Sequence, residues 1–155
     1  LIEPGAVPGN KLFAFGPTFP DRSYTNDDSQ YFELWGGANT GFWPEADLAL
    51  PAGDSVQWQE SWWPLAGLGG LSWANQTVAI HLDRSTVPPT LSLLAAQPQQ
   101  GTVTVWAGQR PVLSQSFSAE PDTPLQWKLD LPEGPIRVKV VDSSNELLLD
   151  YCQDC

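Results

Sequence analysis

Positive charge is scarce in this 155-residue sequence, which has seven Lys and Arg against eighteen Asp and Glu and a net charge of −11. Proteins that bind nucleic acids displace phosphate counterions with a basic surface, and no basic stripe is present here. Anionic membrane surfaces are disfavoured for the same reason. We therefore expect no nucleic-acid partner and no membrane partner, whereas neutral polyols, cations and basic proteins are compatible with this charge.

Histidine and cysteine are also rare, with one His and two Cys in the whole sequence. The single histidine, His81, lies in a strand-like stretch and leaves no credible Ser-His-Asp set, so we expect no catalytic residues in this chain alone. Cys152 and Cys155 form one C-x-x-C, which is half a zinc site at most. They are either joined by a local disulfide or two free thiols near a chain end, and the sequence favours free thiols. The sequence therefore predicts no metal site and no cofactor.

Long apolar runs and helical periodicity are both lacking, and no stretch approaches the length of a membrane span. Period-two alternation recurs instead, among 15 Pro and 13 Gly, which is typical of short strands joined by frequent turns. The expected strands are Lys11–Gly16, Gln30–Gly36, Ala46–Leu50, Ser55–Trp63, Leu71–Leu82, Thr90–Ala95, Thr102–Ala107, Pro111–Phe117, Leu125–Leu131, Ile136–Val141 and Leu147–Tyr151. The glycines of "GLGG" (67–70) indicate a tight backbone passage between strands. The sequence predicts an all-β fold with antiparallel meanders.

The composition changes near Ser85–Pro89, where an aromatic-rich part gives way to evenly spaced strands rich in Val, Leu and Thr. Six of the eight tryptophans precede this point. We therefore expect an aromatic-rich β region over residues 1–85 and a small antiparallel β-sandwich over residues 86–155.

Two stretches, "YFELW" (31–35) and "WQESW" (58–62), repeat one pattern of a glutamate flanked two residues away by large rings. Residues two apart on a strand share a face, so each carboxylate lies beside rings. Such a face suits sugars, because a pyranose packs its C–H face on a ring while its hydroxyls donate to a carboxylate. The candidate ligand-binding residues are Tyr31, Glu33, Trp35, Trp58, Glu60 and Trp62.

The same residues allow two other interpretations. The rings are core residues whose glutamates bond backbone amides or arginines, because an unpaired buried carboxylate is costly. Alternatively, if the two strands are neighbours, Glu33 and Glu60 form an acid/base pair whose separation decides the chemistry. The alternation alone does not choose between these interpretations.

The motifs around these residues resemble a bacterial domain family of unknown function. In order along the chain they are "YFEL" (31–34), the turn "LPAG" (50–53), "WQESWWP" (58–64), "GLGG" (67–70) and "AN" (74–75). The turn departs from the family pattern, because Ala52 separates Pro51 from Gly53. The resemblance covers roughly residues 11–82, about half of the chain.

This resemblance implies part of a galactose mutarotase-like β-supersandwich, in the C-terminal portion of a larger protein that often carries TPR repeats. It also implies a carbohydrate-related role, in which Glu33 and Glu60 match the family's glutamates. We expect a carbohydrate-binding or carbohydrate-associated non-catalytic domain. The alternatives are a structural module that docks a protein partner or other domains of the same protein, and part of a sugar epimerase or glycoside hydrolase site completed by an upstream half. Free strand edges further predict a homodimer.

Overall fold

The computed structural model describes residues 9, 11–18 and 27–155, which form strands, one 3₁₀ turn and connecting segments, with no α-helix in this part of the chain. The strands make three antiparallel sheets, which confirms the predicted all-β class. The chain divides into two compact units, Leu1–Ser61 and Trp62–Cys155. The boundary expected near residue 85 lies inside the second unit, in the connection between two paired strands.

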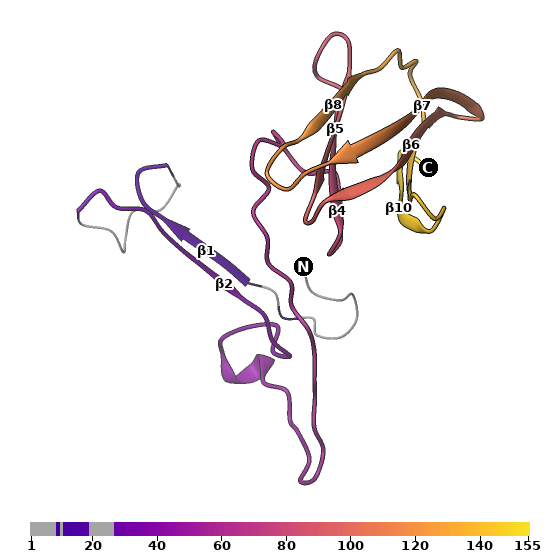
Figure 1. Ribbon diagram of the computed structural model, residues 1–155. Coiled ribbons are helices and arrows are strands. Elements are labelled where there is room, and N and C mark those ends of the chain that lie inside the picture. The colour runs from indigo at the N-terminus through magenta and orange to yellow at the C-terminus, as the bar shows by residue number, and fades with distance from the viewer. Residues whose placement is uncertain (1–8, 10, 19–26) are drawn as a thin grey trace. The chain divides into compact units, whose positions relative to one another are not determined.

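The second unit is a β-sandwich of two four-stranded sheets (Figure 1). One sheet has the order β3-β4-β5-β8, with β3 Trp73–Ala74, β4 Val78–Asp83, β5 Thr90–Ala95 and β8 Leu125–Lys128. The other has the order β10-β9-β6-β7, with β6 Gln99–Ala107, β7 Arg110–Ala119, β9 Ile136–Asp142 and β10 Leu147–Gln153. All seven strands from β4 onward match stretches that the alternation predicts, with ends shifted by a few residues.

The core lies between the two sheets and consists of branched aliphatic side chains. Every second residue of the central strands points inward, and these inward residues are almost completely inaccessible to water: Val78, Ile80, Leu91, Leu93, Val103, Val105, Ile136, Val138 and Val140. Burying one such side chain contributes about 1.5–3 kcal/mol, so this layer is the main source of stability in the second unit.

A second, smaller cluster covers the outer face of β4 and β5. Ala79 and Leu94 are completely buried there beneath Leu68, with Trp63 and Leu65 packed beside them. The indole Nε1 of Trp63 donates to the Asn75 carbonyl at 3.1 Å. This covering segment turns at glycines, and a Cβ on Gly70 would lie 2.6 Å from the His81 ring, as the predicted tight passage requires.

Asn75 joins the two sheets of the sandwich. Its Oδ1 accepts from the amides of Thr77 and Val78 at 2.8 and 2.9 Å, and this turn separates β3 from β4 where one continuous strand was predicted. Its Nδ2 donates to the Leu148 carbonyl on β10, in the opposite sheet, at 2.7 Å. Asn75 thus satisfies backbone groups in both layers.

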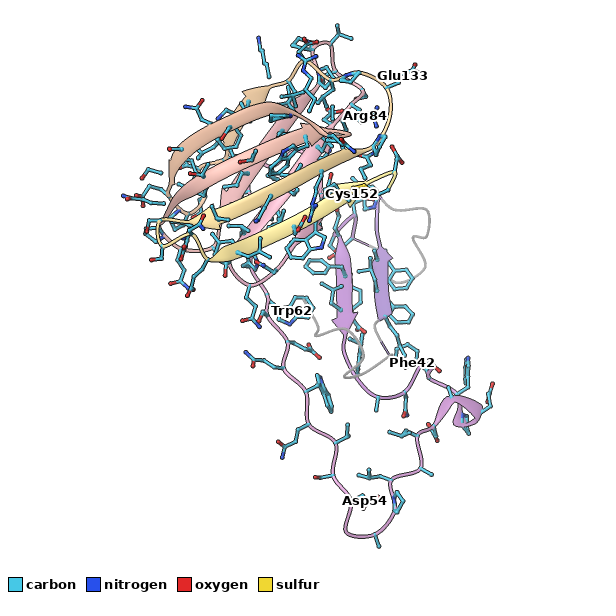
Figure 2. All side chains as sticks on the ribbon, turned by 90° about the vertical axis from the view of Figure 1, so that its right-hand side faces the viewer. Phe42, Asp54, Trp62, Arg84, Glu133 and Cys152 are labelled. Atoms are coloured by element: carbon cyan, nitrogen blue, oxygen red, sulfur yellow. A yellow bond between two sulfur atoms is a disulfide. The ribbon has the colours of Figure 1, made fainter. Side chains whose placement is uncertain are left out.

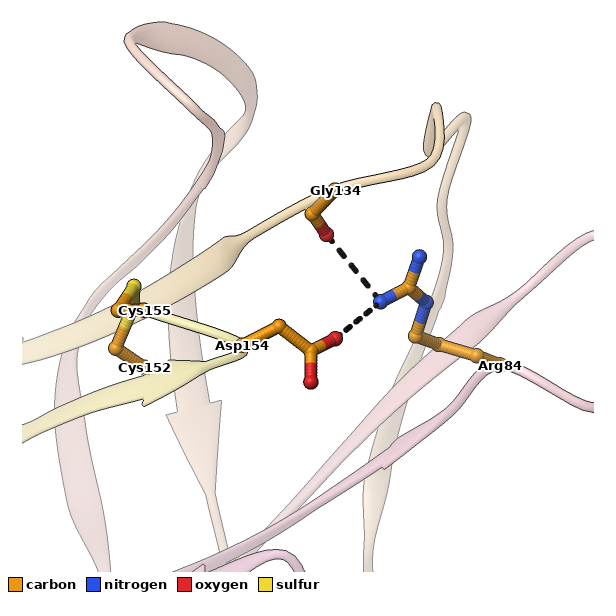
Figure 3. A network of polar contacts seen from close by, with 5 residues as sticks. All are labelled: Arg84, Gly134, Cys152, Asp154 and Cys155. Atoms are coloured by element: carbon orange, nitrogen blue, oxygen red, sulfur yellow. Dashed lines mark hydrogen bonds and ion pairs between the residues drawn. A yellow bond between two sulfur atoms is a disulfide. The ribbon is translucent and has the colours of Figure 1, made fainter.

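Charge pairs link the C-terminal strand and the residues after it to the rest of the second unit, and a disulfide lies at the end of this strand. Arg137 on β9 donates from Nε to Asp150 Oδ1 at 2.7 Å and from Nη2 to Oδ2. Arg84 donates to Asp154, the residue that follows β10, at 3.1 Å and to the Gly134 carbonyl at 3.3 Å (Figure 3).

Cys152 and Cys155 are joined by a disulfide, so the expectation of two free thiols is wrong. Asp154 adopts a left-handed backbone with φ of 62°, which turns the chain back after β10. The turn brings the two Cα atoms to 5.9 Å, the separation that a disulfide needs.

The first unit contains a two-stranded sheet, β1 Lys11–Phe15 with β2 Tyr31–Trp35, followed by the 3₁₀ turn Pro44–Ala46. Both strands were predicted. The strands predicted at Ala46–Leu50 and Ser55–Trp63 are wrong, because residues 47–72 form no strand and only a single bridge at Glu60. Alternation there reflects an extended backbone, but within the described residues no neighbouring strand provides a ladder of hydrogen bonds beyond that bridge.

Asn75→Ala should lower the free energy of unfolding of the second unit by about 2–4 kcal/mol, because buried backbone groups on both sheets lose partners. Asn75→Asp should cost less, since it keeps the acceptor for Thr77 and Val78 and loses only the donor to Leu148. Urea denaturation of the variants measures both values. Gln76→Ala, at the exposed neighbouring position, is the control and should change stability little; equal losses for all three variants would contradict this role of Asn75.

Hydrogen bonds from Arg137 hold the pKa of Asp150 below its ordinary value of 3.8. A depressed pKa in the folded state stabilises the fold above the unfolded-state pKa, and this contribution disappears as pH falls through the folded value. We expect wild type to be more stable than Asp150→Asn at pH 6 and the two to converge below pH 3.8. Thermal unfolding between pH 2 and 7 tests this, and an unchanged difference at pH 2 would argue against it.

Candidate functional site

One face of the β1–β2 sheet carries most of the aromatic rings of its two strands. The antiparallel register places Phe15 opposite Tyr31 and Phe13 opposite Glu33. Residues two apart share a face, so Trp35 joins this set, as predicted for Tyr31, Glu33 and Trp35. Neighbouring rings are close to parallel: the centroids of Phe13 and Phe15 are 6.4 Å apart, those of Phe15 and Tyr31 are 6.3 Å apart, and both pairs are inclined by 23°.

Two further rings come from the loop that follows β2. Phe42 packs against Phe13 with centroids 5.1 Å apart and planes inclined by 58°, and it meets Trp35 edge-on at 5.7 Å. Phe42 and its neighbour Trp43, together with rings from β1 and β2, border a hollow of about 480 Å³, which we call the aromatic hollow. It is lined by Phe13, Phe15, Tyr31, Glu33, Phe42 and Trp43.

The loop that carries Phe42 is held by its own hydrogen bonds. The Asn39 side chain donates to Asp47 at 3.0 Å and accepts from the Leu48 amide at 2.8 Å, which closes the loop at its base. Lys11 donates to the Asn39 carbonyl at 2.5 Å, and its ammonium lies 5.0 Å from the centroid of the Phe42 ring. Phe42, labelled in Figure 2, is therefore positioned beside β1 by the closed loop and by the Lys11 side chain.

Glu33 is the one carboxylate among the described residues that line the hollow. Its Oε2 accepts from the indole Nε1 of Trp35 at 2.5 Å, so the partner of this carboxylate is the ring two residues further along the strand. Glu33 is half-buried, although Tyr31 and Trp35 on either side are 42% and 49% exposed. Two carboxylate oxygens accept about four hydrogen bonds, so the bond from Trp35 leaves further acceptor capacity on Glu33.

The second predicted cluster repeats this local bond outside a strand. The indole Nε1 of Trp58 donates to Glu60 Oε1 at 2.8 Å, which places both side chains on one face as expected. Trp58 is 42% exposed. Trp62 is 59% exposed and belongs to the second unit. Trp58, Glu60 and Trp62 are not among the residues lining the hollow.

None of the eight tryptophans, all of which lie in the described part of the chain, is fully buried. Trp35, Trp43, Trp58 and Trp62 are all more than 40% exposed. This removes the interpretation that the rings beside the two glutamates are core residues. The predicted site did not include Phe13, Phe15, Phe42 and Trp43. Phe13 and Phe15 alternate within "KLFAF", so this pattern could have predicted them. Phe42 and Trp43 lie in a loop, where no alternation indicates which way a side chain points.

The described residues 9, 11–18 and 27–155 hold no group of three or more His, Cys, Asp or Glu able to bind a metal ion. Within the same residues, no helix has the length and apolar character needed to cross a membrane.

Comparison with known proteins finds no family model, no curated protein and no solved structure that matches this chain. The resemblance to a mutarotase-like family therefore stays a prediction.

Asn39→Ala should loosen the loop that positions Phe42. It removes the acceptor of the Leu48 amide, and losing one such hydrogen bond should raise the exchange rate of that amide by about three- to tenfold. Hydrogen exchange followed by NMR measures the rate. Glu45→Ala, at an exposed position in the same loop, is the matched control, and an equal effect of both variants would rule out the closing role of Asn39.

Proposed function

We propose that the aromatic hollow binds a carbohydrate and that this chain is a non-catalytic carbohydrate-binding module. The observation that carries the proposal is five rings grouped around one carboxylate in a hollow of about 480 Å³. This volume is within the range of about 300–1,000 Å³ typical of small-molecule sites.

The near-parallel rings of Phe13, Phe15 and Tyr31 offer an apolar aromatic surface to the C–H face of a sugar ring. Phe42, tilted by 58° against Phe13, forms a wall beside this surface. Glu33 then supplies an acceptor for sugar hydroxyls within an otherwise apolar surface. An apolar ligand would leave this half-buried carboxylate poorly solvated, so a ligand with hydroxyl groups fits the hollow better.

Binding is favoured over hydrolysis, because glycosidases of the common kind place two carboxylates on either side of the scissile bond. The described lining of the hollow supplies Glu33 alone. Glu60 is hydrogen-bonded to Trp58 and lines no part of the hollow. The family resemblance supports the same carbohydrate-related role, as an expectation from similar motifs.

A docking role for a protein partner is the second candidate, and the opposite face of the same sheet favours it. Leu12, Phe32 and Leu34 are 65%, 65% and 45% exposed and form an apolar surface on the other side of β1–β2. Exposed apolar surfaces of this kind mark interaction sites in proteins that are otherwise soluble. The two candidates therefore use different faces of one sheet.

Calorimetric titration of the chain with neutral mono- and oligosaccharides tests the proposed function. Tyr31→Ala and Glu33→Gln should each weaken sugar binding about tenfold or more, through lost stacking and a lost charged acceptor. Phe32→Ala, on the opposite face of the same strand, is the matched control and should bind sugar normally. Absence of heat with every sugar would contradict the proposal.

A further inference from the structure

The sandwich of the second unit has four edge strands, and three of them are unsuited to pairing with another chain. β3 has two residues and β8 has four, ending at Lys128. β10 carries the charged Asp150 and has a register irregularity between Leu147 and Leu149. Short, charged or irregular edges are the usual means by which β proteins avoid edge-to-edge association.

The fourth edge, β7, has a charged residue, a proline and a register irregularity only at its start, over Arg110–Leu113, and none of these features from Leu113 onward. It has ten residues, Arg110–Ala119, pairs with β6 on one side and forms the end of its sheet on the other. The irregularity in its pairing is confined to the stretch before Leu113, so residues 113–119 continue in regular register. An edge of this length presents a row of backbone N–H and C=O groups to a further strand.

Apart from Arg110 at its start, the side chains of β7 are uncharged in a chain that is strongly acidic. Between Arg110 and Glu120 the sequence reads "PVLSQSFSA", without one charged residue, although the protein carries eighteen Asp and Glu. Ser114, Gln115 and Ser116 at its centre are exposed. A strand that paired here would therefore desolvate no charge at the centre of the contact.

We propose that β7 pairs antiparallel with β7 of a second copy of this chain, with Gln115 opposite Gln115. The two four-stranded sheets would then form one continuous eight-stranded sheet across a twofold axis. This register places Leu113 opposite Phe117 of the second copy on the core-facing side, and Ser114 opposite Ser116 on the outer side.

Charge complementarity selects both the occupant and the register. Arg110 begins the strand and Glu120 follows it directly, so an antiparallel copy centred on Gln115 brings the end of β7 that carries Arg110 toward the end of the other copy that carries Glu120. The twofold axis makes this pair of opposite charges occur twice. A parallel copy in register would instead place Arg110 beside Arg110, where like charges repel.

Sedimentation equilibrium of the full 155-residue chain, from about 1 μM to about 1 mM, tests this pairing. Wild type should dimerise. Arg110→Glu and Glu120→Arg should each weaken the dimer by about tenfold, because each turns two attractive pairs into repulsive ones. The double variant Arg110→Glu/Glu120→Arg should restore wild-type affinity, because it reverses the sign of both partners.

The two single variants change the net charge in opposite directions, so a general charge effect would weaken one dimer and strengthen the other. Glu146→Arg, exposed in the turn that leads into β10 at the opposite edge of the sheet, is the control for charge reversal and should dimerise like wild type. Circular dichroism verifies that every variant is folded. Three results would each overturn the proposal: a monomer at every concentration, a dimer indifferent to both single variants, or a double variant that does not recover.

Discussion

The second unit depends on the burial of branched aliphatic side chains between two sheets. The side chains that meet in this core are completely inaccessible to water, for example Val78 and Ile80 from one sheet and Val103 and Val138 from the other. Their packing fixes the position of each strand that carries them. The same burial explains why the chain continues as one unit through residue 85. The inward residues of β4 have no other apolar surface to cover them, so β4 belongs with β5 and the layer opposite.

The first unit shows what happens where such a layer is absent. A two-stranded sheet buries neither of its faces fully, so its rings lie at the surface and pack against one another. Phe13, Phe15 and Tyr31 cover the strands on one side, and the loop with Phe42 covers part of that side in turn. The aromatic content that first suggests a core therefore forms an exposed, hollowed surface, which is the property a binding module needs.

Carboxylate placement follows a local rule in both predicted clusters. Glu33 and Glu60 each accept from an indole two residues away, a contact that alternation along an extended chain supplies without tertiary structure. Their common face was therefore predictable from "YFELW" and "WQESW". The two surroundings differ, because Glu33 lies in a β-ladder that brings Phe13 directly opposite, whereas Glu60 lies in a single bridge.

Sequence by itself determined the all-β class, the alternation of each strand, the shared faces of Tyr31, Glu33 and Trp35, and the tight passage at the glycines, because these depend on period and local sterics. Tertiary structure decided which extended segments became strands, since residues 47–72 have the pattern but form no strand beyond the bridge at Glu60. It also decided the Cys152–Cys155 disulfide, which accompanies a left-handed turn at Asp154. The aromatic hollow belongs to this second class, because strand pairing and a closed loop bring together rings that are up to 30 residues apart in the chain.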